Sequence, residues 1–159
     1  MNNKPKKWFS KAEGLSKLQA YCAYQDRCHQ EVRSKLIELG IYGDDLEEVI
    51  AELITDNFLN EERFARSFAR GKFRIKQWGR LRIQQELKQR AISAYCMRKA
   101  MEEIEEEDYQ TTLETILLKK NTTTKAKDLY ERKSKLARYA LSRGFESGLI
   151  WETLHRIIT

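Results

Sequence analysis

The chain contains few of the residues that mark several common classes of protein. Its 159 residues include one proline, seven glycines, three cysteines and two histidines. Three cysteines without a Cys-X-X-Cys pair argue against a disulfide framework, and no apolar run approaches the roughly 18 residues of a membrane span. The first ten residues lack the apolar core of a signal peptide. We therefore expect a cytoplasmic protein that makes no use of a membrane.

Residue patterns for catalysis or cofactor binding are equally scarce. The sequence has no phosphate-binding glycine loop and no nucleophile elbow. Cys22, Cys28 and His29 suggest part of a metal site, but a fourth ligand of plausible spacing is missing, so ordinary buried thiols are the better interpretation. The carboxylates from Glu102 to Asp108 are more typical of a solvated acidic run than of an acid–base pair. We predict a protein that is not an enzyme and that has no cofactor and no metal.

Charged and helix-forming residues are abundant. Charged residues make up 34% of the chain and hydrophobic residues 41%, a composition that favours helices throughout. Ser10 followed by Glu13 forms a capping box, which predicts a helix from about Lys11 to Gln25. Gly40 supplies the left-handed residue that ends a second helix, and Asp44 lies at the favourable end of a third. The first part of the chain therefore predicts a unit of three short helices.

This three-helix unit recurs twice. Shifts of 51 and then 53 residues align six apolar positions, which are Val32, Leu36, Ile41, Leu46, Ile50 and Leu53, then Ile83, Leu87, Ile92, Met97, Met101 and Ile104, and then Leu136, Ala140, Phe145, Ile150, Leu154 and Ile157. We predict an all-α protein in which three tandem three-helix repeats form an elongated, curved array. The expected divisions are residues 1–58, which include a basic lead-in, residues 59–107 and residues 108–159.

The turn between the second and third helices of each unit recurs with one exception. It reads Leu-Gly-Ile, Arg-Ala-Ile and Arg-Gly-Phe, so that Ala91 stands where the other copies have Gly40 and Gly144. An alanine in a left-handed turn costs roughly 1 kcal/mol. The middle turn is therefore either strained or closed differently.

Net charge alternates in sign along the repeats. It is −6 over residues 41–59, +7 over 60–90, −5 over 91–118 and +7 over 119–143. Basic helices could thus form one edge of the molecule and acidic helices the other. Alternatively, the bands could let neighbouring helices attract one another, although surface ion pairs contribute only about 0–1 kcal/mol each.

The most basic stretch runs from Leu59 to Ile92. On a helix, Phe64, Phe68, Gly71 and Ile75 fall within one apolar stripe, and a row of arginines lies about 125° round the axis. The apolar stripe predicts packing, and the arginines predict a surface that binds a partner. A merely solvated helix face is the alternative.

Two aromatic residues flank these arginines. Trp78 and Phe73 offer rings that could stack on a base or on an apolar patch of a partner, although a Trp78 that fills the joint between two helices is the favoured interpretation. The predicted contact surface for protein or DNA comprises Arg63, Arg66, Arg70, Lys72, Arg74, Lys76, Trp78, Arg80, Arg82, Lys127, Arg132, Lys135 and Arg138.

In the basic stretch, an acidic helix start precedes Arg-Phe-Ala at positions 63–65, and Gly79 opens a helix with Arg-Ile at 82–83 and Glu-Leu at 86–87. These motifs resemble the signature of a known family, the RecX regulatory proteins, which are bacterial modulators of the recombinase RecA. The family is similarly built of tandem three-helix repeats. This chain departs from it with Arg80 in place of a proline and with Ala91 in place of a glycine.

The resemblance implies a non-enzymatic regulator that lies in the helical groove of the RecA filament on single-stranded DNA. Such a regulator hinders filament growth, ATP turnover and strand exchange. The expected partners are the RecA filament and single- or double-stranded DNA, and we expect a monomer. A row of basic helices suits a groove containing phosphates, where binding is sensitive to salt. A DNA-binding repeat protein that acts without a recombinase, and a generic helical adaptor, are the alternatives.

Overall fold

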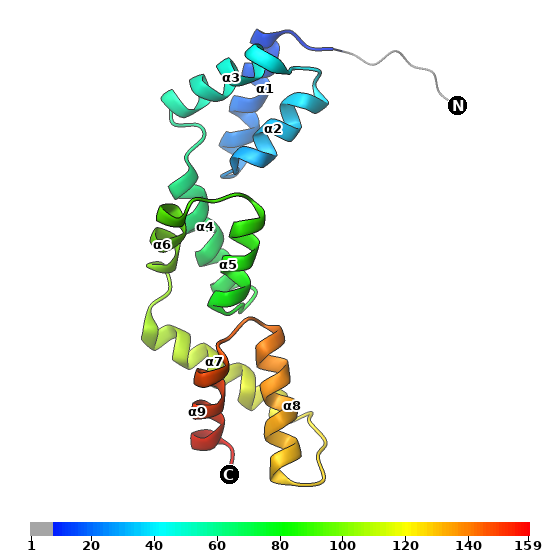
Figure 1. The fold of residues 1–159 in the computed structure, drawn as a ribbon, viewed down its shortest axis with the longest axis vertical. Coiled ribbons are helices and arrows are strands. Elements are labelled where there is room, and N and C mark those ends of the chain that lie inside the picture. The colour runs from blue at the N-terminus through cyan, green and yellow to red at the C-terminus, as the bar shows by residue number, and fades with distance from the viewer. Residues whose placement is uncertain (1–7) are drawn as a thin grey trace, which may run out of the picture.

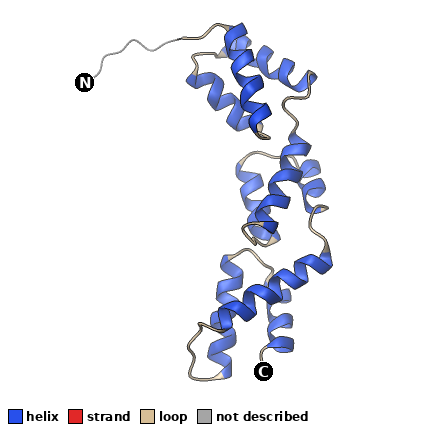
Figure 2. Cartoon of the chain, turned by 180° about the vertical axis from the view of Figure 1, so that it is seen from behind, coloured by secondary structure: helices blue, strands red, loops and turns tan. Residues whose placement is uncertain are grey.

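The computed structural model describes residues 8–159, and these residues form nine helices and no strand (Figures 1 and 2). The helices are α1 (Lys11–Tyr24), α2 (His29–Glu38), α3 (Gly43–Thr55), α4 (Glu61–Arg74), α5 (Arg80–Gln89), α6 (Ala94–Met101), α7 (Glu106–Asn121), α8 (Leu129–Ser142) and α9 (Ser147–Ile157). We refer to α1–α3, α4–α6 and α7–α9 as repeats 1, 2 and 3. The predicted all-α repeat fold is confirmed.

The three repeats follow one another along the long axis of the molecule. Repeat 1 lies at one end, repeat 3 at the other and repeat 2 between them (Figure 1). The predicted division after residue 107 falls in the first turn of α7. Within residues 8–159, no helix combines the length and apolar composition that a membrane crossing requires. Most of the predicted basic lead-in lies outside the described residues, but the Phe9 N–H donates to the Leu39 carbonyl at the end of α2.

The helix ends follow the local signals in the sequence. The Ser10 hydroxyl accepts the N–H of Glu13, whose carboxylate accepts the N–H of Ser10, as the capping box predicts. The turns between the second and third helix of each repeat have the same conformation, with left-handed φ values of 84° at Gly40, 56° at Ala91 and 99° at Gly144. Since Ala91 keeps the hydrogen bonds of the glycine turns, the middle turn is strained and not closed differently.

The buried side chains form two separate hydrophobic clusters. One belongs to repeat 1 alone and includes Leu18, Leu36 and Leu53. The other runs without interruption through repeats 2 and 3 and also includes Cys28, which precedes α2 in repeat 1. Repeats 2 and 3 therefore share one core, whereas repeat 1 has its own.

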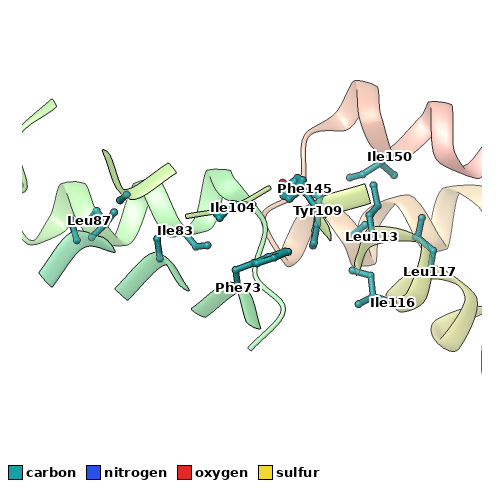
Figure 3. Packing of buried hydrophobic residues seen from close by; sticks show 14 of the residues in the cluster. Phe73, Ile83, Leu87, Ile104, Tyr109, Leu113, Ile116, Leu117, Phe145 and Ile150 are labelled. Atoms are coloured by element: carbon teal, nitrogen blue, oxygen red, sulfur yellow. The ribbon is translucent and has the colours of Figure 1, made fainter. Parts of the chain in front are cut away.

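Three aromatic rings carry the shared core from repeat 2 into repeat 3. The ring of Tyr109 lies 5.9 Å from that of Phe73 in α4 and 5.0 Å from that of Phe145, which precedes α9. Figure 3 shows these rings between the aliphatic residues of the two repeats. Tyr109, which begins the buried face of α7, is thus the central contact between the repeats.

The recurring apolar positions are largely buried, with a shift in the later third helices. Met97 and Met101 are only half-buried, because α6 directs Cys96 and Ala100 into the core instead. Likewise, Ile158 is buried at the end of α9, and Ile157 packs only partly against the cluster. The six-position pattern therefore identifies these helices correctly but misplaces the buried face of α6 by one residue.

The apolar stripe predicted for α4 is partly wrong. Its last turn ends at Arg74, so Ile75 leaves the helix and its side chain is 80% exposed. The buried face of α4 is instead Phe64, Ala65, Ala69 and Phe73. Small alanine side chains allow α6 to pack closely against α4, which the large apolar residues alone did not indicate.

Candidate functional site

The joint between repeats 2 and 3 is made by direct contact between backbones. The Gly79 N–H donates to the Arg143 carbonyl at 2.8 Å, and the Leu81 N–H donates to the Gly144 carbonyl at 3.0 Å. A Cβ atom on Gly79 would lie 2.3 Å from the carbonyl atoms of Gly144. Likewise, a Cβ on Gly144 would lie 2.4 Å from the Cβ of Arg82. Only glycine at both positions permits this approach.

Arg80 and Tyr109 complete this joint with polar contacts. The Tyr109 hydroxyl accepts the Arg80 N–H at 3.0 Å and donates to Glu146. The Arg80 guanidinium lies 3.9 Å from the centre of the Tyr109 ring and pairs with Glu146 at 2.8 Å and with Glu106. Burial, together with the hydrogen bond to Glu146, raises the pKa of Tyr109. Arg80, one of the predicted contact residues, therefore stabilises the joint between the two repeats through contacts within the chain.

Arg63 and Arg66 are also occupied within the chain. Arg63 donates to Asp26 at 2.7 Å and to the Phe58 carbonyl at 3.1 Å, which ties repeat 2 to repeat 1. Arg66 donates to Glu103 and Glu102 at 3.2 Å each, which ties α4 to the segment after α6. For Arg66, whose partners lie in the acidic band of residues 91–118, the alternating charge serves attraction between neighbouring segments.

Two of the predicted cations in repeat 3 shape the α7–α8 loop. Arg132 donates to the side chain of Asn121 at 2.8 Å and to the Thr124 carbonyl at 3.0 Å. Lys135 donates to the Lys125 carbonyl at 2.6 Å. Both side chains thus supply hydrogen bonds to a loop whose carbonyls have left regular helix.

The remaining predicted cations are not paired with an acid. Within residues 8–159, no carboxylate lies within 4.0 Å of the side-chain nitrogens of Arg70, Lys72, Arg74, Lys76, Arg82, Lys127 and Arg138. Arg74 and Lys76 are exposed on either side of Ile75, in the turn between α4 and α5. This turn, residues 74–76, is the most accessible part of the predicted surface in repeat 2.

Trp78 fills the joint and also holds two of these cations. It is half-buried against the shared core. The Lys72 ammonium lies 5.0 Å from the centre of its ring, and the Arg82 guanidinium lies 4.1 Å away. Phe73 is only 5% exposed, so it cannot stack on an external base.

Comparison with known proteins identifies the family to which this chain belongs. The family models described as "RecX, second three-helix domain" and "RecX, third three-helix domain" match residues 60–101 and 106–154. The chain belongs to the RecX family. These two matches correspond to repeats 2 and 3.

Individual RecX relatives agree with the family models. The chain is 31% identical over 147 residues to the regulatory protein RecX of Prosthecochloris aestuarii, covering 92% of this chain and 95% of the relative. It is 29% identical to the RecX of Lactococcus lactis subsp. cremoris (strain SK11), but spans only 51% of that protein's length. The crystal structure of RecX from Lactobacillus salivarius has the same fold, with a TM-score of 0.81 at 21% identity, covering 92% of this chain and 96% of that one.

This RecX-family chain also has features that the sequence pattern did not identify. A cleft of about 730 Å³ separates repeats 1 and 2, and Tyr21, Phe68, Lys72 and Arg90 line it together with four acidic residues. Arg90, which was not predicted, stacks on Phe68 with its guanidinium 4.8 Å from the ring centre. Its position at the end of α5 carries no distinguishing signal in the sequence.

The suggested metal site is not formed in the described part of the chain. No group of three or more potential ligands gathers there. Cys22 and Cys28 are buried and not disulfide-bonded, and burial raises the pKa of both thiols. The thiols are therefore held in their protonated form, which ligates metals poorly.

Proposed function

We propose that this protein binds the RecA recombinase filament on single-stranded DNA and hinders its growth, ATP turnover and strand exchange, without catalysing a reaction itself. Membership of the RecX family carries the proposal, because the matched relatives are regulatory proteins and the matched segments include most of repeats 2 and 3. The protein would act in the cytoplasm as a monomer.

The distribution of unpaired cations supports an extended contact. The remaining predicted cations have no acidic partner within residues 8–159, and they are spread over repeats 2 and 3, which share one core and present their surfaces in a fixed relation. Phosphates and acidic side chains in a filament groove would both attract them, with release of counterions and a dependence on salt. The proposed contacts are Arg70, Lys72, Arg74, Lys76, Trp78, Arg82, Lys127 and Arg138.

Ile75 favours a partner that includes protein. Its aliphatic side chain is 80% exposed between the unpaired cations Arg74 and Lys76. A nucleic-acid backbone offers phosphates to the two cations but little to an aliphatic group, whereas a protein surface offers acidic and apolar groups together. The turn at residues 74–76 is therefore the proposed contact with the recombinase.

A charge-reversal experiment tests this contact. Arg74→Glu with Lys76→Glu should weaken binding to the RecA filament by roughly ten- to a hundredfold at low salt, and the loss should shrink as salt screens the charges. The matched control is Lys88→Glu with Arg98→Glu, which changes the net charge equally at exposed residues on other faces of repeat 2. Equal losses in both double variants would show that only net charge matters and would refute the contact.

A second variant separates the recombinase from bare DNA. Ile75→Ser leaves all charges in place and should not affect folding, because the side chain is exposed. It should weaken binding to the filament and leave binding to bare single-stranded DNA unchanged at the same salt. A parent protein that binds bare DNA as tightly as the filament, with no effect of Ile75→Ser, would favour a DNA-binding protein that acts without the recombinase.

A further inference from the structure

A recess at the joint between repeats 2 and 3 gathers cations that the predicted surface did not include. It has a volume of about 410 Å³, and Lys119, Lys120 and Arg143 line it together with Gln77, Tyr139, Ile116 and two threonines. No carboxylate belongs to this lining, whereas the cleft between repeats 1 and 2 has four acidic residues in its walls. The recess is thus positively charged in a concave site, where walls of low dielectric concentrate the potential.

The local structure accounts for only part of this charge. Lysines in the last turn of α7 are favoured by the negative end of the helix dipole. The Thr122 and Thr123 N–H groups and hydroxyls already satisfy the terminal carbonyls of Lys119 and Lys120, so the ammonium groups are not needed as caps. Arg143, the C-cap of α8, likewise lies at the negative end of its helix, so the dipoles favour all three cations but do not explain why the ends of two helices meet around one recess.

Arg143 is positioned by the backbone and keeps a donor unused. Its guanidinium donates to the Lys76 carbonyl and, at 3.4 Å, to the Gln77 carbonyl. Its Nε–H is buried and has no acceptor in the described part of the chain. Such buried donors without an acceptor are uncommon, and because both acceptors of the guanidinium are neutral carbonyls, its positive charge is not neutralised by these contacts.

The opposite wall of the recess is aromatic. The Lys120 ammonium lies 4.8 Å from the centre of the half-buried Tyr139 ring, so this cation contacts the ring at the recess while the residue as a whole remains exposed. Cations, neutral polar groups and one ring around a volume of this size match the requirements of a phosphate with an attached organic group.

We propose that this recess binds a phosphate group, with Lys119, Lys120 and Arg143 as its counter-charges. The phosphate could belong to a nucleic-acid strand or to a small phosphate compound, since both present the same oxyanion. The proposal does not depend on the recombinase, because the cations of the recess are other residues than those of the adjacent turn at residues 74–76.

Nuclear magnetic resonance of the full ¹⁵N-labelled chain tests the site. Pyrophosphate and, separately, an eight-residue oligothymidylate are titrated at low salt, and the signals of the Gln77, Thr122 and Thr123 amides and of the Arg143 Nε–H are followed. We expect saturable shifts confined to these signals. The double variant Lys119→Ala with Lys120→Ala should weaken the affinity measured from these shifts at least tenfold. The double variant Lys88→Ala with Arg98→Ala, which removes the same charge elsewhere, should leave this affinity unchanged. All four of these side chains are exposed, so both double variants should fold.

The outcomes separate the two sources of phosphate. Shifts with pyrophosphate alone assign the recess to a small phosphate compound, and shifts at the same signals with the oligonucleotide assign it to a strand. Shifts spread over all basic helices, or equal binding by the two double variants, would overturn the proposal. Filament binding by Lys119→Ala with Lys120→Ala is measured in parallel, so that a failure of the phosphate site is distinguished from a failure of the proposed regulatory function.

Discussion

Gly79→Ala should destabilise repeats 2 and 3 without disturbing any local backbone preference. The φ angle of Gly79 is −77°, which alanine adopts freely, so the cost comes from the close approach alone. The new Cβ would lie 2.3 Å from the Gly144 carbonyl and would force the two backbones apart. Overpacking typically costs about 1–3 kcal/mol, and the two hydrogen bonds between the repeats contribute about 0.5–1.5 kcal/mol each. The expected total is roughly 2–6 kcal/mol.

Thermal unfolding followed by tryptophan fluorescence measures this loss. Trp78 and Trp151 pack against the shared core and report on it. At roughly 4 °C per kcal/mol, the melting temperature should fall by about 8–24 °C. Gly71→Ala is the matched control, because its Cβ would meet no atom within 4 Å inside α4, and it should instead stabilise by about 0.5–1 kcal/mol. If the melting temperature of Gly79→Ala is equal to or higher than that of the parent protein, the close contact between the two backbones is refuted.

Three further predictions concern stability. Ala91→Gly should raise the free energy of unfolding by roughly 0.5–1 kcal/mol in urea titrations, because it relieves a left-handed alanine; a decrease would contradict the strained turn. The pKa of Tyr109 is raised in the folded state, so above about pH 10 the unfolded chain loses this proton first. The free energy of unfolding should therefore fall above this pH, and it should fall less in Tyr109→Phe. Equal dependence on alkaline pH in the two proteins would contradict this. Arg66→Glu, which places a third carboxylate beside Glu102 and Glu103, should lower the melting temperature, whereas Arg70→Glu should leave it almost unchanged; equal melting temperatures would contradict the pairing.

The fold could be predicted because burial recurs along the helices. Val32, Ile83 and Leu136 are all fully buried at equivalent places, and hydrophobic periodicity reports such positions directly. The left-handed turn at Gly40 could also be predicted, because the conformation of a turn depends on its own few residues. Ile75 was misplaced because the helical spacing was continued one residue beyond the end of α4.

The candidate site could be predicted only in part, because pairing partners are distant in sequence. Arg66 meets carboxylates 36 and 37 residues later, and Arg80 meets Glu146 66 residues later. Helical periodicity shows which face a side chain occupies but not which helix lies opposite. Structural and available cations therefore looked alike, and the recess that contains Arg143 joins three segments that no single pattern connects.

The division of the hydrophobic side chains into two clusters also determines how the chain unfolds. Repeat 1 encloses its own cluster, and of its described buried residues Cys28 alone belongs to the other one, so α1–α3 can open while most of the apolar surface of the other six helices stays buried. Repeats 2 and 3 have no such independence, since Tyr109 and Phe145 belong to a core that α4 also builds. Amide hydrogen exchange should therefore show two cooperative units of unequal size. A single free energy of unfolding then describes repeats 2 and 3 together, and repeat 1 requires a second one.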